Sequence, residues 1–155
     1  MTPAINSAKH AGFAFQLHEY EQDATAPSYG LEAAEKLGVT AGQVFKTLVV
    51  KLDGKQLAVG IVPVTHQLGL KQIAKAAGAK KAAMAQPDEV ERATGYVLGG
   101  VSPLGQKRRL ATFIDHSAED FASIYVSAGR RGLEIELTPK DLALLSQATF
   151  APLAT

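Results

Sequence analysis

Residues 44–64 have the sequence VFKTLVVKLDGKQLAVGIVPV, in which two apolar, β-forming runs flank Asp53-Gly54. An Asp-Gly pair between two such runs is a strong signal for a β-hairpin, because both residues tolerate the backbone conformation of a tight turn. This hairpin is the most clearly predicted element of the chain. We therefore expect a sheet built largely from antiparallel strands.

Other elements are predicted around the hairpin from capping residues, prolines, glycines and the alternation of apolar side chains. Helices are expected at 3–12, 31–37, 70–77 and 87–95, from Thr138-Pro139 onwards, and as one turn capped by Ser117 that ends at Phe121. Single strands are expected at 13–20, 96–98 and 112–114. A second hairpin is expected from strands at 124–126 and 133–137, and a loop at 21–30. The predicted fold is one α+β domain over residues 1–155, a largely antiparallel sheet with helices around it.

The composition excludes several classes of protein. With 155 residues, 46% apolar and 20% charged, the chain has the size and composition of one globular domain. Its net charge of +1 argues against a protein that coats duplex DNA. It contains no cysteine, which excludes disulfides, thiolate metal sites and a cysteine nucleophile. We find no signal peptide and no apolar stretch near the ~18 residues of a membrane helix, so we expect a cytoplasmic protein that binds neither membrane nor DNA.

Familiar catalytic motifs are missing from the sequence. There is no Gly-x-Ser-x-Gly elbow, so an activated serine of that kind is not expected. None of the four histidines has metal-ligand spacing. They are His10, His18, His66 and His116. We therefore expect no bound metal and no cofactor.

Residues 95–109, GYVLGGVSPLGQKRR, form a glycine-rich segment with a basic end. Gly100 and Gly105 have the spacing of a phosphate-binding loop, but Gln106 and Lys107 occupy the positions of its lysine and its hydroxyl residue, which argues against ATP binding. The backbone amides of such a loop can still approach a ligand closely. The alternative is a glycine turn with a solvated basic end.

Lys46 is the most informative single residue. Alternation along the predicted strand places it on the same face as Val44, Leu48 and Val50. A lysine in an apolar stripe is unfavourable unless its ammonium reaches water or an anion. Lys46 is therefore either a lysine at a sheet edge that reaches solvent, or a group that meets a bound phosphate, carboxylate or developing oxyanion.

Basic residues are concentrated in three parts of the sequence. These clusters contain Lys80 and Lys81, then Lys107, Arg108 and Arg109, then Arg130 and Arg131. If these clusters converge in space, they form an anion-binding rim that suits a tRNA end or a nucleotide better than a long duplex. If they do not converge, they are separate solvated faces.

Several of these residues also belong to motifs of a known family. The matching stretches are FQLHEY at 15–20, QVFKTL at 43–48, GAKK at 78–81, TGYVLGGVSPLGQK at 94–107, IYVS at 124–127 and RGLEIEL at 131–137. Through them the chain resembles the YbaK family, the bacterial Cys-tRNA(Pro) deacylases, from about residue 3 to 150. The wider superfamily includes the editing insertion domain of bacterial prolyl-tRNA synthetase. The resemblance implies a small fold on a curved mixed sheet with helices outside.

The resemblance also implies roles for individual residues of this chain. The implied catalytic residues are Lys46, Tyr20 and Gly99. The implied substrate-binding residues are Tyr29, Thr47, Gly100, Ser102, Pro103, Ser127 and Glu134. The family typically has Asp at the position of Glu134. Alternation along the predicted strand instead places Glu134 on the face opposite Leu133 and Ile135, which predicts that it faces solvent.

The implied activity is trans-editing, the removal of wrongly attached cysteine from tRNA(Pro), with Cys-tRNA(Cys) as a second substrate. Family members are described as substrate-assisted: the cysteine thiol attacks its own ester carbonyl, forming a cyclic thioester and releasing the tRNA. Such an enzyme needs positioning and anion stabilisation rather than a nucleophile of its own. The alternatives are a related hydrolase that clears alanine by activating water, and a non-catalytic adaptor for aminoacyl-tRNA or a synthetase. A domain of this size is expected to touch only the acceptor end, so tRNA selection would need prolyl-tRNA synthetase as a partner.

Overall fold

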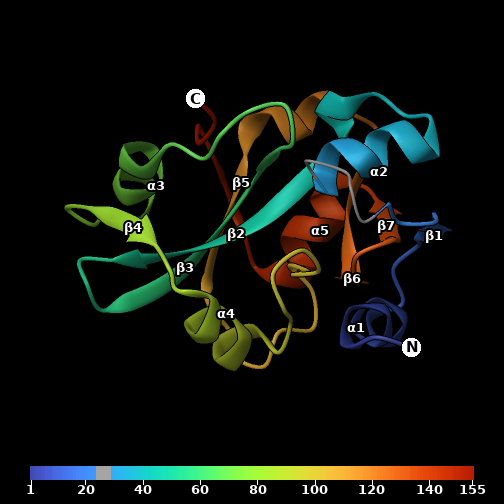
Figure 1. The fold of residues 1–155 in the computed structure, drawn as a ribbon. Helices are drawn as coiled ribbons and strands as arrows, with labels where there is room; N and C mark the ends of the chain where they lie inside the picture. Colours follow the sequence, from blue (N-terminus) through green and yellow to red (C-terminus); the bar gives the residue numbers. More distant parts are fainter. Residues whose placement is uncertain (24–28) are drawn as a thin grey trace.

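The structure, a computed structural model, describes residues 1–23 and 29–155 (Figure 1). Its strands are β1 (Gln16–Glu19), β2 (Phe45–Leu52), β3 (Gln56–Pro63), β4 (Ala82–Met84), β5 (Ala111–Asp115), β6 (Ile124–Arg130), β7 (Leu133–Leu137) and β8 (Thr149–Ala151). Its α-helices are α1 (Pro3–Ala11), α2 (Tyr29–Leu37), α3 (Leu70–Ala77), α4 (Pro87–Thr94) and α5 (Pro139–Ser146), with 3-10 turns at η1 (Ala41–Gln43) and η2 (His116–Asp120).

The larger sheet has five strands in the order β4-β2-β3-β5-β8. Strands β2 and β3 form the predicted antiparallel hairpin, with Lys51 opposite Leu57 near the turn. The turn residues Asp53 and Gly54 have φ values of 50° and 72°, left-handed values that Asp-Gly adopts readily. Strand β5 pairs in parallel with both β3 and β8, so this sheet is mixed.

The smaller sheet is antiparallel, with the order β1-β7-β6. A parallel bridge between Val44, just before β2, and Tyr125 in β6 connects the two sheets. Helix α2 packs on this junction, because its buried alanines belong to the same apolar cluster as Val44 and Tyr125. The predicted fold class is confirmed, and its strands are divided between two connected sheets.

Capping residues mark the helices as the sequence predicts. The side chains of Thr2 and Thr138 accept backbone N–H hydrogen bonds in the first turns of α1 and α5. Helices α3 and α4 end immediately before Gly78 and Gly95. These helix boundaries were predictable because caps act locally, through atoms a few residues apart.

Two strand predictions differ from the structure. The strand expected at 96–98 is wrong: Val97 and Leu98 are exposed, and Leu98 and Gly99 form a turn that is closed by a hydrogen bond from the Gly100 N–H to the Val97 carbonyl. Conversely, β4 and β8 were missed. Each has only three residues and pairs along the edge of the larger sheet, so its conformation depends on the neighbouring strand rather than on its own sequence.

Two helix boundaries also differ. Helix α2 begins at Tyr29, inside the segment expected to be a loop; residues 24–28 of that segment lie outside the described residues. The turn η2 is capped by Asp115, whose carboxylate accepts from the N–H of Ser117 at 3.2 Å, rather than by Ser117 itself. The Asp115 carboxylate also accepts from the backbone N–H groups of Leu153 and Ala154, which sequence spacing could not reveal.

The arrangement of the strands leaves one part of β2 open. Figure 1 shows α2 and the β6–β7 pair at one end of β2, and α3 and β4 at the other. Strand β4 pairs only with residues 50–52 of β2. Among the described residues, no second strand covers the edge of β2 at 45–48, opposite its β3 side. This open edge is where the candidate site forms.

Candidate active site

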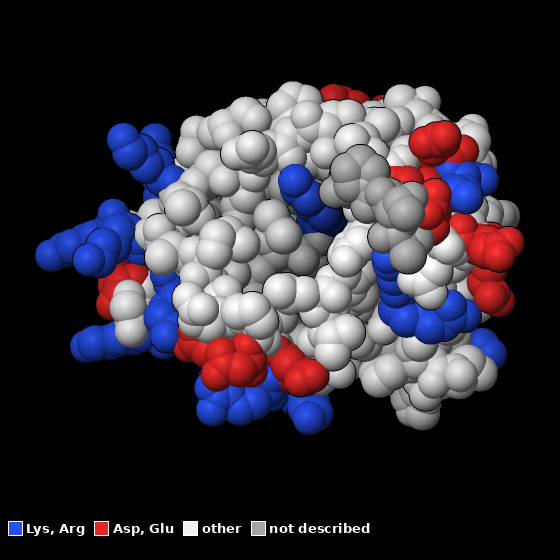
Figure 2. Space-filling view, in the orientation of Figure 1, with Lys and Arg blue, Asp and Glu red and all other residues white. Residues whose placement is uncertain are grey.

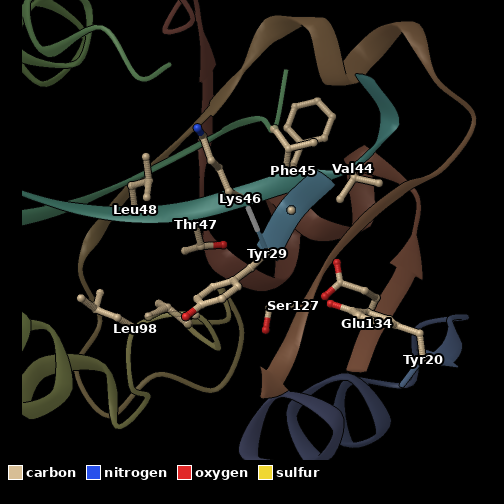
Figure 3. Close-up of a pocket in the computed structure, with 14 residues that line it drawn as sticks. Tyr20, Tyr29, Val44, Phe45, Lys46, Thr47, Leu48, Leu98, Ser127 and Glu134 are labelled. Carbon is tan, nitrogen blue, oxygen red and sulfur yellow. The ribbon is translucent and has the colours of Figure 1, made fainter. Parts of the chain in front are cut away.

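A cavity of about 240 Å³ lies where α2, the start of β2, the loop after α4 and the β6–β7 pair meet (Figure 3). Seven of the predicted site residues line it: Tyr20, Tyr29, Lys46, Thr47, Gly99, Ser127 and Glu134. Its remaining walls are mainly apolar, from Val44, Phe45, Leu48, Val64, Leu98 and Val101. Pockets for drug-sized ligands measure ~300–1,000 Å³, so this one suits a smaller group, such as an amino-acid side chain.

Lys46 brings a cation into the cavity from β2, where it lies opposite Val62 of β3. Its side chain is half-buried, and burial lowers the pKa of its ammonium. No carboxylate pairs with Lys46 in the part of the chain that the structure describes. An unpaired, partly desolvated ammonium attracts an anion or a developing negative charge.

Thr47 supplies a buried hydroxyl. The residue is 9% exposed, and its Oγ1 has no hydrogen-bond partner within residues 1–23 and 29–155. Buried polar groups in native proteins are nearly always paired, so an unpaired hydroxyl in a cavity wall favours a ligand that completes its hydrogen bonding. Ser127 is different, because its Oγ already accepts a hydrogen bond from the Gly129 N–H at 3.1 Å.

Glu134 is the buried acid of the cavity. It lies in β7, opposite Ser127 of β6 and His18 of β1, and is only 7% exposed. The prediction that it faces solvent is wrong: four of the five residues of β7 are buried, so both faces of this strand are covered. Burial raises the pKa of the Glu134 carboxyl to about 8, so at neutral pH it is mostly protonated.

Tyr20 lies beside Glu134 at the same end of the cavity (Figure 3). Burial raises the pKa of the Tyr20 phenol, and the charge of Glu134 raises it further, which places the two groups within electrostatic range. The Tyr20 backbone N–H donates to the Gly132 carbonyl at 3.0 Å, and this bond fixes the end of β1 against the β6–β7 turn. The phenol is therefore a neutral hydrogen-bonding group at neutral pH.

Tyr29 and Gly99 form the opposite wall. The Arg131 guanidinium lies over the Tyr29 ring, 4.2 Å from its centroid. A Cβ atom on Gly99 would lie 2.6 Å from Cε2 of that ring, and Gly99 has φ of 91°, a value that L residues rarely adopt. Helix α2 approaches closely as well, since a Cβ on Gly30 would lie 2.2 Å from Cγ1 of Val64. Glycine is required at both positions for steric reasons.

Gly100, Ser102 and Pro103 are buried and do not line the cavity. The Ser102 Oγ accepts a hydrogen bond from the Leu104 N–H at 3.2 Å, within the loop. A Cβ on Gly100 would lie 2.8 Å from Cα of Arg130, so the loop packs directly against the end of β6. These residues hold the loop that carries Gly99.

The basic clusters do not converge into one rim. Lys80 and Lys81 line a separate groove with Asp53 and Lys55, next to the far end of β2. At ~3.3 Å per residue, that end of the strand is roughly 20 Å from Lys46. Figure 2 shows many basic side chains over α3, β4 and the β2–β3 hairpin, with smaller groups elsewhere on this face.

The other basic residues have distinct surroundings. Lys107, Arg108 and Arg109 are exposed after the glycine-rich loop. Arg130 is exposed and pairs with Glu19 at 3.2 Å. Arg131 forms an ion pair with buried Glu32 at 3.0 Å, so its guanidinium already has a carboxylate partner within the protein. The expectation that Arg131 contacts tRNA is therefore not supported by its geometry.

Sequence reasoning missed Glu32, the partner that holds Arg131. Nothing in the composition of its segment distinguishes it from the exposed Glu35 on the same helix. Only the packing of α2 on the β6–β7 turn buries one carboxylate and exposes the other.

The residues at 1–23 and 29–155 contain no cluster of three or more His, Cys, Asp or Glu side chains able to hold a metal ion. Within those ranges, no helix is both long and apolar enough to cross a bilayer.

Comparison with known proteins identifies the family of this chain. A family described as "Aminoacyl-tRNA editing domain" matches residues 25–145. The Enterococcus faecalis protein EbsC, described as a candidate Cys-tRNA(Pro)/Cys-tRNA(Cys) deacylase, is 40% identical over 79% of this chain and 74% of its own. The Escherichia coli multifunctional Ser/Thr-tRNA deacylase ProXp-y is 30% identical over 93% of this chain and 85% of its own.

The fold has close relatives among solved structures. A crystal structure described as a candidate trans-editing enzyme for prolyl tRNA synthetase superimposes with a TM-score of 0.85 and 25% identity. The match covers 100% of this chain and 99% of that one. A second crystal structure, of a protein described as hypothetical, has a TM-score of 0.87 at 24% identity and shows the likeness of the fold.

Proposed function

Since the chain belongs to the aminoacyl-tRNA editing domain family, we propose that it is a trans-editing deacylase that removes cysteine from Cys-tRNA(Pro). The observation that carries this proposal is the ammonium of Lys46, which has no carboxylate partner in the described part of the chain and lies in a cavity sized for an amino-acid side chain. The 40% identity with EbsC favours cysteine as the amino acid. Cys-tRNA(Cys) is a second substrate to be tested.

The proposed mechanism uses the nucleophile of the substrate. The thiol of the esterified cysteine loses its proton and attacks the ester carbonyl, so that a C–S bond forms and the C–O bond to the ribose breaks. The ribose oxygen takes up a proton, and the cyclic thioester is hydrolysed afterwards. The described lining of the cavity contains hydroxyls but no histidine or cysteine, which fits an enzyme that lacks its own activated nucleophile.

Lys46 would stabilise the negative charge that develops on the carbonyl oxygen. The backbone at Gly99 approaches the same cavity and would hold the ester in place. One preorganised donor to such an oxyanion contributes ~10²–10³ to kcat in other enzymes. Holding the thiol near the carbonyl converts the attack into an intramolecular reaction with a large effective molarity.

Glu134 and Tyr20 would bind the α-amino group at the other end of the cavity. An aminoacyl ester carries a cationic amine, and a nearby cation lowers the pKa of a buried carboxyl. Binding would therefore favour the ionised form of Glu134, which is mostly protonated in the free protein. The Tyr20 phenol can donate a hydrogen bond to the resulting carboxylate.

A second candidate substrate class is supported by Thr47. Its buried hydroxyl, unpartnered among the described residues, would pair with a hydroxyl side chain of the substrate. ProXp-y, at 30% identity, is named as a Ser/Thr-tRNA deacylase. We therefore propose that serine and threonine esters of tRNA be tested as substrates beside the cysteine ester, with the alanine ester as the small apolar alternative.

The tRNA would approach through exposed basic residues. Lys107, Arg108 and Arg109 follow the loop that carries Gly99, and Arg130 lies against that loop at Gly100. Lys80 and Lys81 would contact a more distant part of the acceptor arm. Prolyl-tRNA synthetase is the proposed partner for selecting the tRNA.

The test is a deacylation panel with purified protein. It compares Cys-, Ser-, Thr- and Ala-tRNA(Pro) and Cys-tRNA(Cys), together with Cys-tRNA(Pro) whose thiol is methylated. We expect fastest release from Cys-tRNA(Pro) and none from the S-methyl substrate. Preferred cleavage of Ser- or Thr-tRNA would replace cysteine by the second candidate. Tight binding without cleavage of any substrate would support the non-catalytic adaptor.

A further inference from the structure

Arg131 forms a buried ion pair next to the cavity. Its Nε donates to Oε1 of Glu32 at 3.1 Å, and a terminal nitrogen lies 3.0 Å from the same oxygen. The Glu32 side chain is 2% exposed and the Arg131 side chain 18% exposed. One charge-assisted hydrogen bond and a second close nitrogen–oxygen contact join the guanidinium to the carboxylate and restrict the position of both groups. This pair is thus a fixed part of the protein interior.

The ion pair also connects three segments of the chain. The other oxygen of Glu32 accepts a hydrogen bond from the Asp23 N–H at 2.6 Å, and Arg131 donates to the Asp23 carbonyl. Glu32 lies on α2, Arg131 in the turn between β6 and β7, and Asp23 three residues after Tyr20. These contacts hold the segments that carry both pocket tyrosines against one turn.

Tyr29 is the pocket residue that this unit contacts directly. The Arg131 guanidinium covers the ring at 4.2 Å from its centroid, and the backbone at Gly99 closes on the Cε2 and Cδ2 edge. Tyr29 is otherwise half-exposed at the surface. Removing the Arg131 guanidinium would therefore uncover one face of the ring.

We propose that Arg131 and Glu32 are positioning residues that hold the Tyr29 ring in the cavity wall and so align the aminoacyl group for deacylation. This inference rests on the function proposed above. Neither side chain lines the cavity, so both act through Tyr29 rather than by touching the substrate. The competing explanation for Arg131 is a direct contact with a tRNA phosphate.

The test uses conservative variants, because an alanine at position 131 would leave the buried carboxylate of Glu32 unpaired and could prevent folding. Arg131→Lys keeps the positive charge but lacks the flat guanidinium that covers the ring. Arg92→Lys is the matched control, since Arg92 pairs with Asp88 on the exposed surface of α4. Thermal unfolding of each variant confirms that it is folded.

We expect Arg131→Lys to lower kcat for the preferred aminoacyl-tRNA about tenfold with a smaller change in KM, because small misplacements of reacting groups reduce rates steeply. Arg92→Lys should match the wild type. Adding Arg131→Lys to Tyr29→Leu should cause little further loss, since the ring through which Arg131 acts is already gone. A fully additive double variant, or a reduced salt dependence of tRNA binding in Arg131→Lys, would overturn the proposal in favour of a phosphate contact.

A second measurement does not depend on activity. In protein with isotope-labelled tyrosine, the ring signals of Tyr29 should shift or broaden in Arg131→Lys and remain unchanged in Arg92→Lys. Unchanged Tyr29 signals in a folded Arg131→Lys protein would overturn the positioning role. A wild-type protein that cleaves none of the aminoacyl-tRNAs would overturn the proposed function instead, and the ring signals would still decide whether Arg131 holds Tyr29.

Discussion

Lys46 and Thr47 point to opposite faces of β2, yet both line the same cavity. Consecutive side chains in a strand always alternate, so a cavity on one face of a covered strand would include only one of them. Here β4 pairs only with residues 50–52, and the cavity extends around the uncovered edge of β2. One short segment therefore supplies both an ammonium and a buried hydroxyl to the candidate site.

Replacing Lys46 by alanine should reduce kcat by about 10²–10³, the usual effect of removing a preorganised oxyanion donor. The fold should survive, because Lys46 has no ion-pair partner among the described residues. Single-turnover deacylation and thermal unfolding measure the two effects. Lys51→Ala is the control: Lys51 lies on the same strand and pairs with Glu89 away from the cavity. Turnover near the wild-type rate in folded Lys46→Ala protein would refute the proposed role.

Stability should fall as the pH rises through the range set by Glu134. The pKa of this carboxyl is about 8 in the folded protein, against an ordinary value of 4.5. Between these values the folded state keeps a proton that the unfolded state has lost, so the free energy of unfolding decreases with pH, by up to ~1.4 kcal/mol per pH unit. The stabilising effect is complete below pH 4.5 and lost above about pH 8.

The measurement is urea unfolding between pH 5 and pH 8.5 for the wild type and Glu134→Gln, which cannot ionise. The curve of the variant should be flatter over this range. Parallel curves for the two proteins would show that Glu134 does not titrate with a raised pKa.

Gly99→Ala should impair both stability and activity. The backbone there has φ of 91°, and the new Cβ would lie 2.6 Å from the Tyr29 ring. Gly12→Ala is a matched control, since Gly12 has φ of 76° and nothing within 4 Å of the added Cβ. Both variants should lose ~1–3 kcal/mol of stability from backbone strain, but only Gly99→Ala should also lose deacylation. Equal activity in the two variants would contradict a steric requirement at the cavity wall.

Substrate assistance can be separated from a protein nucleophile through Ser127. Ser127→Ala should reduce deacylation of Cys-tRNA(Pro) through the geometry of the cavity without abolishing it, because its Oγ is already bound by the Gly129 N–H. Ser102→Ala should reduce activity only by loosening the loop, in which the Ser102 Oγ accepts a hydrogen bond from the Leu104 N–H. Metal chelators should not change the rate of deacylation. Complete loss of activity in Ser127→Ala with an intact fold would identify that hydroxyl as the attacking group.

The exposed basic residues should control binding of tRNA rather than choice of the amino acid. Neutralising any one that contacts a phosphate should lower the slope of log affinity against log salt by ~0.7, the value for single-stranded RNA. The residues to be tested singly are Lys80, Lys81, Lys107, Arg108, Arg109 and Arg130. The ranking of substrates in the deacylation panel should stay the same. Unchanged salt slopes in all six variants would mean that these residues are only solvated surface.

Features of the fold with local causes could be predicted from the sequence. The Asp53-Gly54 turn fixes the β2–β3 hairpin because both residues accept a left-handed backbone, and caps such as Thr138 start helices through bonds to the next turn. The motifs around Lys46 and Gly99 likewise lie in segments that line the cavity.

The exposure and the pairing of side chains in those segments depend on how distant parts of the chain pack together. Glu134 is buried because its face of β7 forms part of the cavity wall, whereas its alternation with Leu133 predicted exposure. The Arg131 side chain is mostly buried and pairs with Glu32 of α2. Its neighbour Arg130 is exposed and pairs with Glu19. Burial and ion pairing depend on residues about 100 positions apart in the chain, and no local pattern records which of them will meet.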